Sequence, residues 1–140
     1  DLRLVLARSL CMKNKTNRLT VFFDGSCPLC RREIGFYQRR PGADMIDWVD
    51  LTDADQHHVD TQLGPDLTCT AALERFHVRT STGSLKDGAA GFVELWKALP
   101  QFRWLGRLVS IPPILWIAER AYNAFLKIRP RMQAMARAQA

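Results

Sequence analysis

Two cysteines separated by two residues are the side chains of this sequence best suited to chemistry. Cys27 and Cys30 belong to the segment Asp-Gly-Ser-Cys-Pro-Leu-Cys at 24–30, which follows an apolar stretch and precedes a helix-like one. The free amide groups and the dipole of a helix N-terminus stabilise an anion, so a cysteine placed there tends toward the nucleophilic thiolate. The spacing also lets the second sulfur reach the first. The pair can therefore form a disulfide or supply two ligands of a metal site.

Thiol–disulfide exchange assigns different roles to the two sulfurs. A thiolate attacks a disulfide sulfur, so one cysteine needs a lowered pKa and the other must lie within bonding distance. We expect Cys27, nearer the helix start, to be the attacking thiol and the more exposed one, with Cys30 resolving the mixed disulfide. Asp24 is the candidate proton acceptor if burial raises its pKa; its alternative role is to form an Asx turn with the Gly-Ser pair that follows it, or to hold that loop. Two packed thiols without chemistry are the alternative for the pair.

A zinc site would need ligands beyond the dithiol. Cys and His are the preferred zinc ligands, which makes His57, His58 and Cys69 the residues to consider. The sequence has no second Cys-x-x-Cys pair and no spaced pair of histidines to support them. We therefore expect no metal and no organic cofactor, with both histidines on a loop surface and Cys69 a buried thiol in a short helix.

The hydrophobic pattern predicts the elements that position the dithiol. Residues 19–23 are short, β-branched and aromatic, which indicates a buried strand; 28–40 have helical spacing; 45–51 indicate a second strand. A strand, a helix and a strand within about 35 residues have the length of a right-handed parallel crossover. Further along, the pattern predicts a polar loop with some helix at 52–67, a short helix at 68–73, strands at 75–79 and 84–87, and a helical run at 92–99 that Pro100 ends.

The most apolar part of the chain is 104–118, and a helix follows it to about residue 128. A membrane span needs about 20 uninterrupted apolar residues, whereas Arg107 and the pair at 112–113, Pro-Pro, interrupt this stretch. Two helices covering one face of the sheet are the favoured interpretation. An interfacial membrane anchor is the alternative.

Length and composition fit one domain with a hydrophobic core, since 47% of the 140 residues are hydrophobic. We divide it into an N-terminal extension at 1–18, expected to be flexible, a core at 19–100, and C-terminal helices at 101–140 packed on that core. Met12 precedes a short polar leader and is a candidate native start. On that hypothesis 1–11, which include Cys11, are an upstream extension outside the fold.

Charge and cysteine usage bear on partners and compartment. The net charge is +6, but the 20 Lys and Arg residues are spread out and lack the aromatic interleaving of RNA-binding proteins. We therefore expect no nucleic-acid partner. The four cysteines are unevenly placed, unlike a framework of structural disulfides, and no signal-peptide pattern begins the chain. These features predict a reducing, cytoplasmic location.

The segment at 21–33, Val-Phe-Phe-Asp-Gly-Ser-Cys-Pro-Leu-Cys-Arg-Arg-Glu, resembles the signature of the DCC family of thiol-disulfide oxidoreductases, named for its Asp, Cys and Cys. Asp24, Cys27 and Cys30 match that signature in order and spacing. The likeness extends through most of residues 19–128. It implies an α/β, thioredoxin-like fold with a β-α-β-β-β-α core and a C-terminal helical extension.

The same resemblance implies a function. It predicts a thiol-disulfide oxidoreductase with a reversible Cys27/Cys30 couple, acting on a disulfide-containing protein or a small thiol. Ala90-Gly91 stands where members often carry Asp-Ala, and no proline precedes the strand that holds Phe76, unlike thioredoxins. The alternative is a non-catalytic thioredoxin-like module that docks a protein partner or a membrane surface through its apolar C-terminal helices.

Overall fold

The structure is a computed structural model that describes residues 2–3 and 18–138. The predicted N-terminal extension at 1–18, with Cys11 and Met12, lies outside the described residues except for Leu2, Arg3 and Arg18. The described elements are, in chain order, β1 (Leu19–Phe23), α2 (Pro28–Gln38), a 3₁₀ turn (Ala43–Met45), β2 (Ile46–Asp50), α3 (Gln56–Leu63), α4 (Cys69–Glu74), β3 (His77–Arg79), β4 (Leu85–Asp87), α5 (Gly88–Ala98), a 3₁₀ turn (Pro100–Phe102), α6 (Arg103–Val109) and α7 (Pro112–Ala138).

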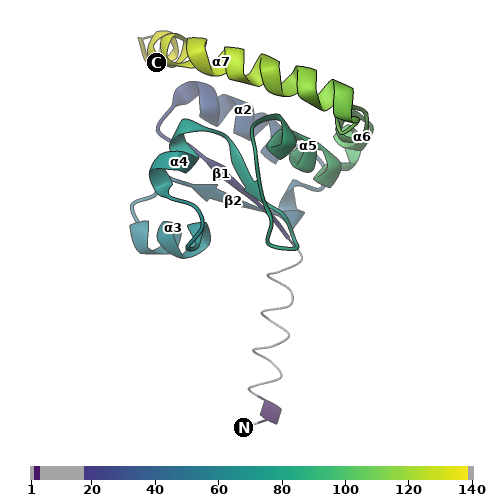
Figure 1. Ribbon diagram of the computed structural model, residues 1–140. Coiled ribbons are helices and arrows are strands. Elements are labelled where there is room, and N and C mark those ends of the chain that lie inside the picture. The colour runs from purple at the N-terminus through teal and green to yellow at the C-terminus, as the bar shows by residue number, and fades with distance from the viewer. Residues whose placement is uncertain (1, 4–17, 139–140) are drawn as a thin grey trace.

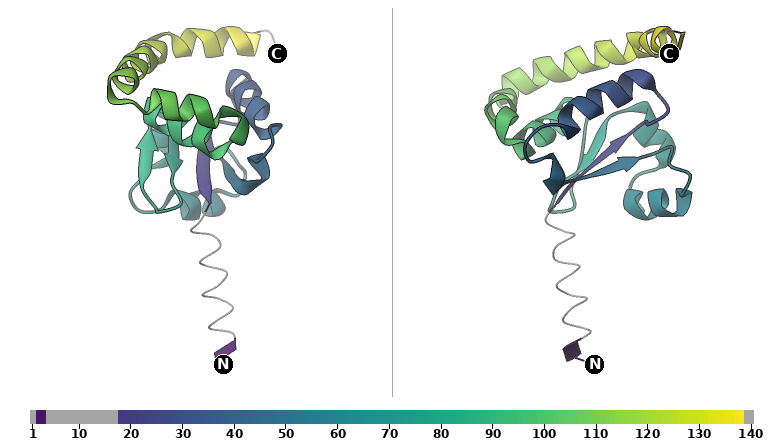
Figure 2. Two further views of the ribbon diagram at one scale, coloured as in Figure 1. Left: turned by 90° about the vertical axis from the view of Figure 1, so that its right-hand side faces the viewer. Right: turned by 180° about the vertical axis from the view of Figure 1, so that it is seen from behind.

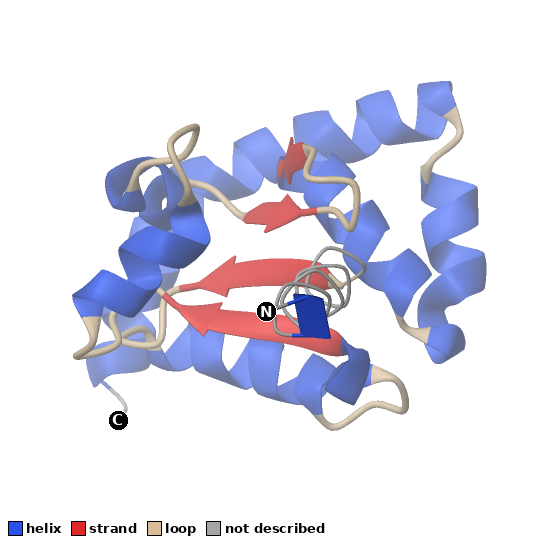
Figure 3. Ribbon diagram, turned by 90° about the horizontal axis from the view of Figure 1, so that it is seen from below, coloured by secondary structure: helices blue, strands red, loops and turns tan. Residues whose placement is uncertain are grey.

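The four strands form one mixed sheet in the order β2-β1-β3-β4, and Figure 3 shows them side by side. β1 and β2 are parallel, with Val21 opposite Trp48, so β1-α2-β2 is the predicted parallel crossover. β3 runs antiparallel to β1, with Val21 opposite Val78, and β4 runs antiparallel to β3. The sheet and its helices confirm the predicted thioredoxin-like α/β core.

Neighbouring residues of β1 face opposite sides of the sheet and organise two cores. Val21 is fully buried in a cluster that includes Ile34 of α2 and Leu95 of α5. Phe22 belongs to the second cluster, on the other face, together with Val59 of α3 and other residues of α3, α4 and β2. Because apolar side chains alternate across both faces, β1 is held in one register, and its C-terminal end is a fixed base for the dithiol.

The C-terminal helices pack on the helices of the core rather than directly on the sheet, so only the expectation that they would cover one face of the sheet was wrong. α6 packs against α5, and α7 crosses over both α2 and α5, as Figures 1 and 2 show. The reason is geometric, because α2 and α5 already cover that face of the sheet. α6 and α7 therefore add a further helical layer outside them. α7 also runs to Ala138, beyond the predicted end near residue 128, and contains Pro130 within the helix.

α7 is fastened to the core by a polar cluster near the start of β3. Arg75 pairs with Asp87 and with Glu119 of α7. The backbone N–H of Phe76 donates to the Tyr122 hydroxyl at 2.8 Å. Gly88 adopts a φ of +57° at this point, and a Cβ there would overlap the side chains of Arg75 and Glu119. The cluster around Arg75 therefore requires glycine at position 88, both for the backbone conformation and for the lack of a side chain.

Candidate dithiol site

The junction of β1 and α2 places the two cysteines at a helix N-terminus, as the sequence predicts. β1 ends at Phe23, a short turn follows, and Cys27 is the N-cap residue of α2 with extended backbone angles. Pro28 occupies the first helical position, where its missing N–H costs nothing. The N–H of Arg31 donates to the Cys27 carbonyl at 3.0 Å, which closes the first helical turn around Cys30.

Two carboxylates hold the turn that leads into the dithiol. The Asp24 carboxylate accepts hydrogen bonds from the Ser26 N–H at 2.9 Å and from the Ser26 hydroxyl at 2.6 Å. The N–H of Gly25 donates to the carboxylate of Asp50, at the end of β2, at 3.0 Å. A Cβ at Gly25 would overlap that carboxylate. Asp24 thus closes an Asx turn, and Asp50 ties the turn to the neighbouring strand.

The exposure of the two sulfurs reverses the sequence expectation. Cys27 has 0% of its surface exposed, whereas Cys30 is partly exposed. Cys27 is the N-cap residue of α2, and its side chain interacts with the thiol of Cys30. Both residues are free thiols in this structure.

The surroundings shift the pKa values of the two thiols in opposite directions. Burial by itself raises the pKa of Cys27, but interactions with the N–H and thiol of Cys30 and with the N–H of Leu29 outweigh it, so the pKa is lowered. Burial raises the pKa of Cys30, as does its contact with Cys27, and the nearby Arg129 guanidinium only partly offsets this. Cys27 is therefore the thiol favoured as thiolate, and Cys30 is favoured as the protonated partner.

The far end of α7 covers Cys30. Nη2 of Arg129 lies 3.6 Å from the Cys30 sulfur, and Nε2 of Gln133 lies 3.8 Å from it. Nη1 of Arg129 also donates to the Glu74 carbonyl at 3.4 Å. Sequence analysis missed both side chains because they follow Cys30 by about a hundred positions in a basic tail. Only the crossing of α7 over α2 brings them to the dithiol.

Two hollows border the site beneath α7. A small cavity of about 60 Å³ is lined by Asp24, Cys30 and Arg129 together with apolar side chains. A larger and mostly apolar groove of about 570 Å³ lies beside it, and Phe92 and Phe125 line both. Cys30 therefore lines the smaller cavity, and the apolar groove adjoins that cavity between α2, α5 and α7.

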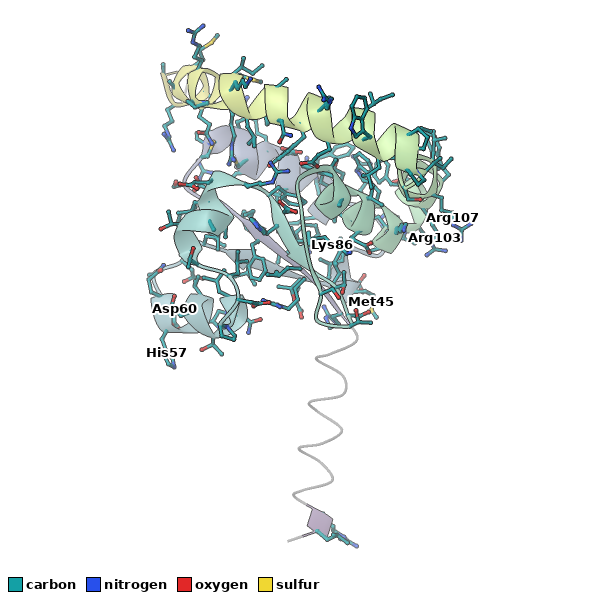
Figure 4. The ribbon with its side chains drawn as sticks, in the orientation of Figure 1. Met45, His57, Asp60, Lys86, Arg103 and Arg107 are labelled. Atoms are coloured by element: carbon teal, nitrogen blue, oxygen red, sulfur yellow. The ribbon has the colours of Figure 1, made fainter. Side chains whose placement is uncertain are left out.

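The remaining candidate residues do not join the dithiol. His57 and His58 are exposed on α3, at a corner where Figure 4 shows His57 pointing away from the body of the protein. Cys69 is partly rather than fully buried at the first position of α4, and its sulfur lies 3.8 Å from the Leu51 carbonyl oxygen. Within residues 2–3 and 18–138, no three His, Cys, Asp or Glu side chains gather as a metal site. No helix in the same part of the chain combines the length and apolarity that crossing a membrane requires.

Comparisons with known proteins cover most of the chain. The model of the DCC1-like thiol-disulfide oxidoreductase family matches residues 21–135, which include Cys27, Cys30 and most of α7. The chain is 26% identical over 113 residues to an uncharacterized chloroplastic protein of Arabidopsis thaliana, At5g50100. That match covers 80% of this chain and 51% of the relative, so the chain spans about half of the relative's length. No solved structure matches the chain. The chain therefore belongs to the DCC1-like thiol-disulfide oxidoreductase family.

Proposed function

We propose that the protein exchanges thiols and disulfides through reversible oxidation of Cys27 and Cys30. The observation that carries this proposal is the asymmetry of the two thiols at the start of α2. Cys27 has a lowered pKa and Cys30 a raised one, although the two side chains are in contact. This is the division that exchange needs, with one thiol ionised for attack and one protonated until the mixed disulfide forms.

The proposed reaction balances with a disulfide substrate and no further reactant. The Cys27 thiolate attacks one substrate sulfur, forming a Cys27–substrate disulfide and releasing the other substrate sulfur as a thiolate, which takes up a proton. Cys30 then loses its proton and attacks the Cys27 sulfur, which breaks the mixed disulfide and releases the second substrate thiol. The substrate gains two electrons and two protons, and Cys27 and Cys30 become a disulfide. The reverse sequence oxidises a dithiol substrate.

Two charged side chains are proposed to promote the resolving step, in which Cys30 attacks the mixed disulfide. Arg129 lowers the pKa of Cys30 from the value that burial alone would give, so it favours the thiolate that attacks the mixed disulfide. Asp24 lines the same small cavity as Cys30 and is the proposed acceptor of its proton. Its hydrogen bonds to Ser26 support a structural role as well.

Burial of Cys27 sets a condition on the mechanism. Its sulfur is fully covered, so the attack on a substrate must follow a local opening of the turn before α2 or of the end of α7. The apolar groove beside Cys30 supports a substrate whose disulfide is flanked by apolar groups, whether a protein or a small molecule.

The proposal is tested by trapping the mixed disulfide with oxidised glutathione. In Cys30→Ser the resolving thiol is absent, so glutathione should accumulate on Cys27, as peptide mass spectrometry would show. Cys27→Ser should form far less adduct, because burial, the larger cause of the raised pKa of Cys30, remains in that variant. Cys69→Ser is the matched control and should behave as the unmodified protein. Equal adduct formation on the two cysteines, or none on Cys27, would contradict the proposed roles.

A further inference from the structure

Large apolar side chains are exposed around the turn between α6 and α7. Trp104 has 65% of its surface exposed and Trp116 has 59%, values unusual for tryptophan in a folded domain. Positions 104, 108 and 111 share one face of α6 and the turn after it, because they are spaced by four and three residues. We call this set the corner patch, and its members are Trp104, Leu108, Ile111, Trp116 and Ile117.

The charge around the corner patch has one sign. No acidic residue occurs between Glu94 and Glu119, whereas that stretch includes Arg103 and Arg107. Both arginines are exposed and project from α6 in Figure 4. The Arg120 guanidinium lies 4.4 Å above the ring centre of Trp116. Among the described residues these arginines have no carboxylate partner within salt-bridge distance.

We propose that the corner patch docks the protein on the surface of an anionic lipid bilayer. Tryptophan side chains favour the boundary between headgroups and acyl chains, where the ring is apolar and the indole N–H stays hydrated. Arginines beside them pair with anionic headgroups, and each cation near such a surface strengthens binding. Arginines could also attract an acidic protein partner, but exposed tryptophans on both sides of the turn between α6 and α7, with arginines beside them, are the combination that the boundary of an anionic bilayer favours.

Docking at this corner leaves the dithiol outside the contact region. Arg129 and Gln133 contact Cys30 near the C-terminal end of α7, whereas Trp116 lies near its start. The rise of a helix separates the two regions by about 20 Å. Bilayer docking and thiol chemistry are therefore separable properties, and the inference does not rest on the proposed function.

The test is cosedimentation of the full chain with vesicles of phosphatidylcholine, with and without about one third phosphatidylserine. The protein should bind the anionic vesicles, and Trp104→Ser/Arg107→Glu should weaken that binding by about tenfold or more. The matched control is Met45→Ser/Lys86→Glu, which removes an exposed apolar side chain and reverses one charge away from α6 and α7 (Figure 4). The control should bind as the unmodified protein does.

Several outcomes would overturn the proposal. Equal binding to neutral and anionic vesicles, no binding to either, or equal loss in both double variants would each contradict an anionic lipid site at this corner. A light-scattering mass for the unmodified protein that corresponds to a dimer, and that falls to a monomer in Trp104→Ser/Arg107→Glu, would assign the corner to a second copy instead. Circular dichroism checks that both variants fold, and Trp116→Ser alone provides a second test of the same surface.

Discussion

Cys27 and Cys30 have different surroundings although they share the first turn of one helix. The N–H groups of α2 act on the Cys27 sulfur strongly enough to overcome its burial, whereas Cys30 points toward α7 and gains only partial compensation from Arg129. Replacing a single charged residue near the pair should therefore shift the pKa of one thiol in a direction that can be stated in advance.

Replacing Arg129 should make Cys30 harder to ionise. Burial and the contact with Cys27 raise the pKa of Cys30 and Arg129 lowers it, so Arg129→Met should raise that pKa further. The midpoint of the pH dependence of Cys30 alkylation would then move to higher pH, and mixed disulfides would resolve more slowly. Lys127→Met is the control on the same helix. An unchanged midpoint for Cys30 in Arg129→Met would show that the guanidinium does not act on the sulfur.

Asp24 is tested by a substitution that keeps its turn. Burial opposes ionisation of Cys27, and the Asp24 carboxylate adds to this through charge repulsion. Asp24→Asn retains an oxygen that accepts from Ser26 but removes the charge, so the midpoint of Cys27 alkylation should move to lower pH. If Asp24 also accepts the Cys30 proton, the glutathione adduct on Cys27 should persist longer than in the unmodified protein.

The control for that substitution is Asp53→Asn, because Asp53 accepts a hydrogen bond from the Asp55 N–H at 3.0 Å in a similar turn away from the thiols. A lower alkylation midpoint with an unchanged adduct lifetime would restrict Asp24 to a structural and electrostatic role. No change in either quantity would contradict both proposals for this residue.

At the scale of elements, α7 differs from the rest of the fold because none of its residues is fully buried. Half-buried apolar side chains such as Tyr122, whose ring centre lies 6.1 Å from that of Phe92, pack it on the core. Polar contacts supplement this packing, with the Arg75 cluster at one end of the contact and the Cys30 contacts at the other. Such an element can separate locally at lower cost than α2 or α5. This property fits the opening that attack by the buried Cys27 requires.

Arg75→Met should weaken this attachment. The guanidinium pairs with Asp87 and Glu119 and donates to Asn123, so its loss leaves a partly buried carboxylate unpaired. We expect the free energy of unfolding to fall by about 1–3 kcal/mol in urea titrations, together with faster alkylation of Cys27. Arg18→Met removes the more exposed pair with Asp47 and should cost less than about 1 kcal/mol. An equal loss of unfolding free energy in the two variants would contradict the role assigned to the Arg75 cluster in holding α7.

The sequence predicted local elements better than the layer that covers the site. β1 is found at 19–23 as expected, because a short run of β-branched and aromatic residues indicates a strand buried on both faces, and α2 begins at Pro28. α3 lies within the stretch predicted as a polar loop with some helix, and its bounds were not predicted because its composition is polar; Asp55 caps it by accepting from the His58 N–H. α7 was predicted too short, and a proline such as Pro130 ordinarily indicates a helix end. The helix instead continues through Pro130 to Ala138, and Arg129 and Gln133 on either side of that proline contact Cys30.

The candidate site was predicted only in part for a related reason. Asp24, Cys27 and Cys30 are neighbours in the sequence, so their spacing is visible there. Asp50 and Arg129 reach the dithiol through strand pairing and helix crossing, which no local pattern encodes. The relative exposure of Cys27 and Cys30 depends on tertiary packing and was predicted in the wrong order.

At the scale of the whole molecule, two cores on opposite faces of one sheet hold β1, and the end of β1 holds the dithiol. The layer formed by α6 and α7 then gives the molecule two distinct regions, a covered dithiol near one end of α7 and an exposed corner patch near the other. Membership of the DCC1-like family supports the chemistry of the first region. The cytoplasmic location and the absence of a nucleic-acid partner stay predictions from the sequence.

The measurement that tests the central claim most directly is a redox titration of the full chain in glutathione buffers, with Cys27 and Cys30 followed by alkylation and mass spectrometry. Both thiols should convert together in one two-electron transition, at a potential between about −270 and −120 mV. Cys27→Ser should abolish the transition, and Cys69→Ser should leave it unchanged. If Cys27 and Cys30 stay reduced across that range, or oxidise independently of each other, the account of a catalytic dithiol is contradicted.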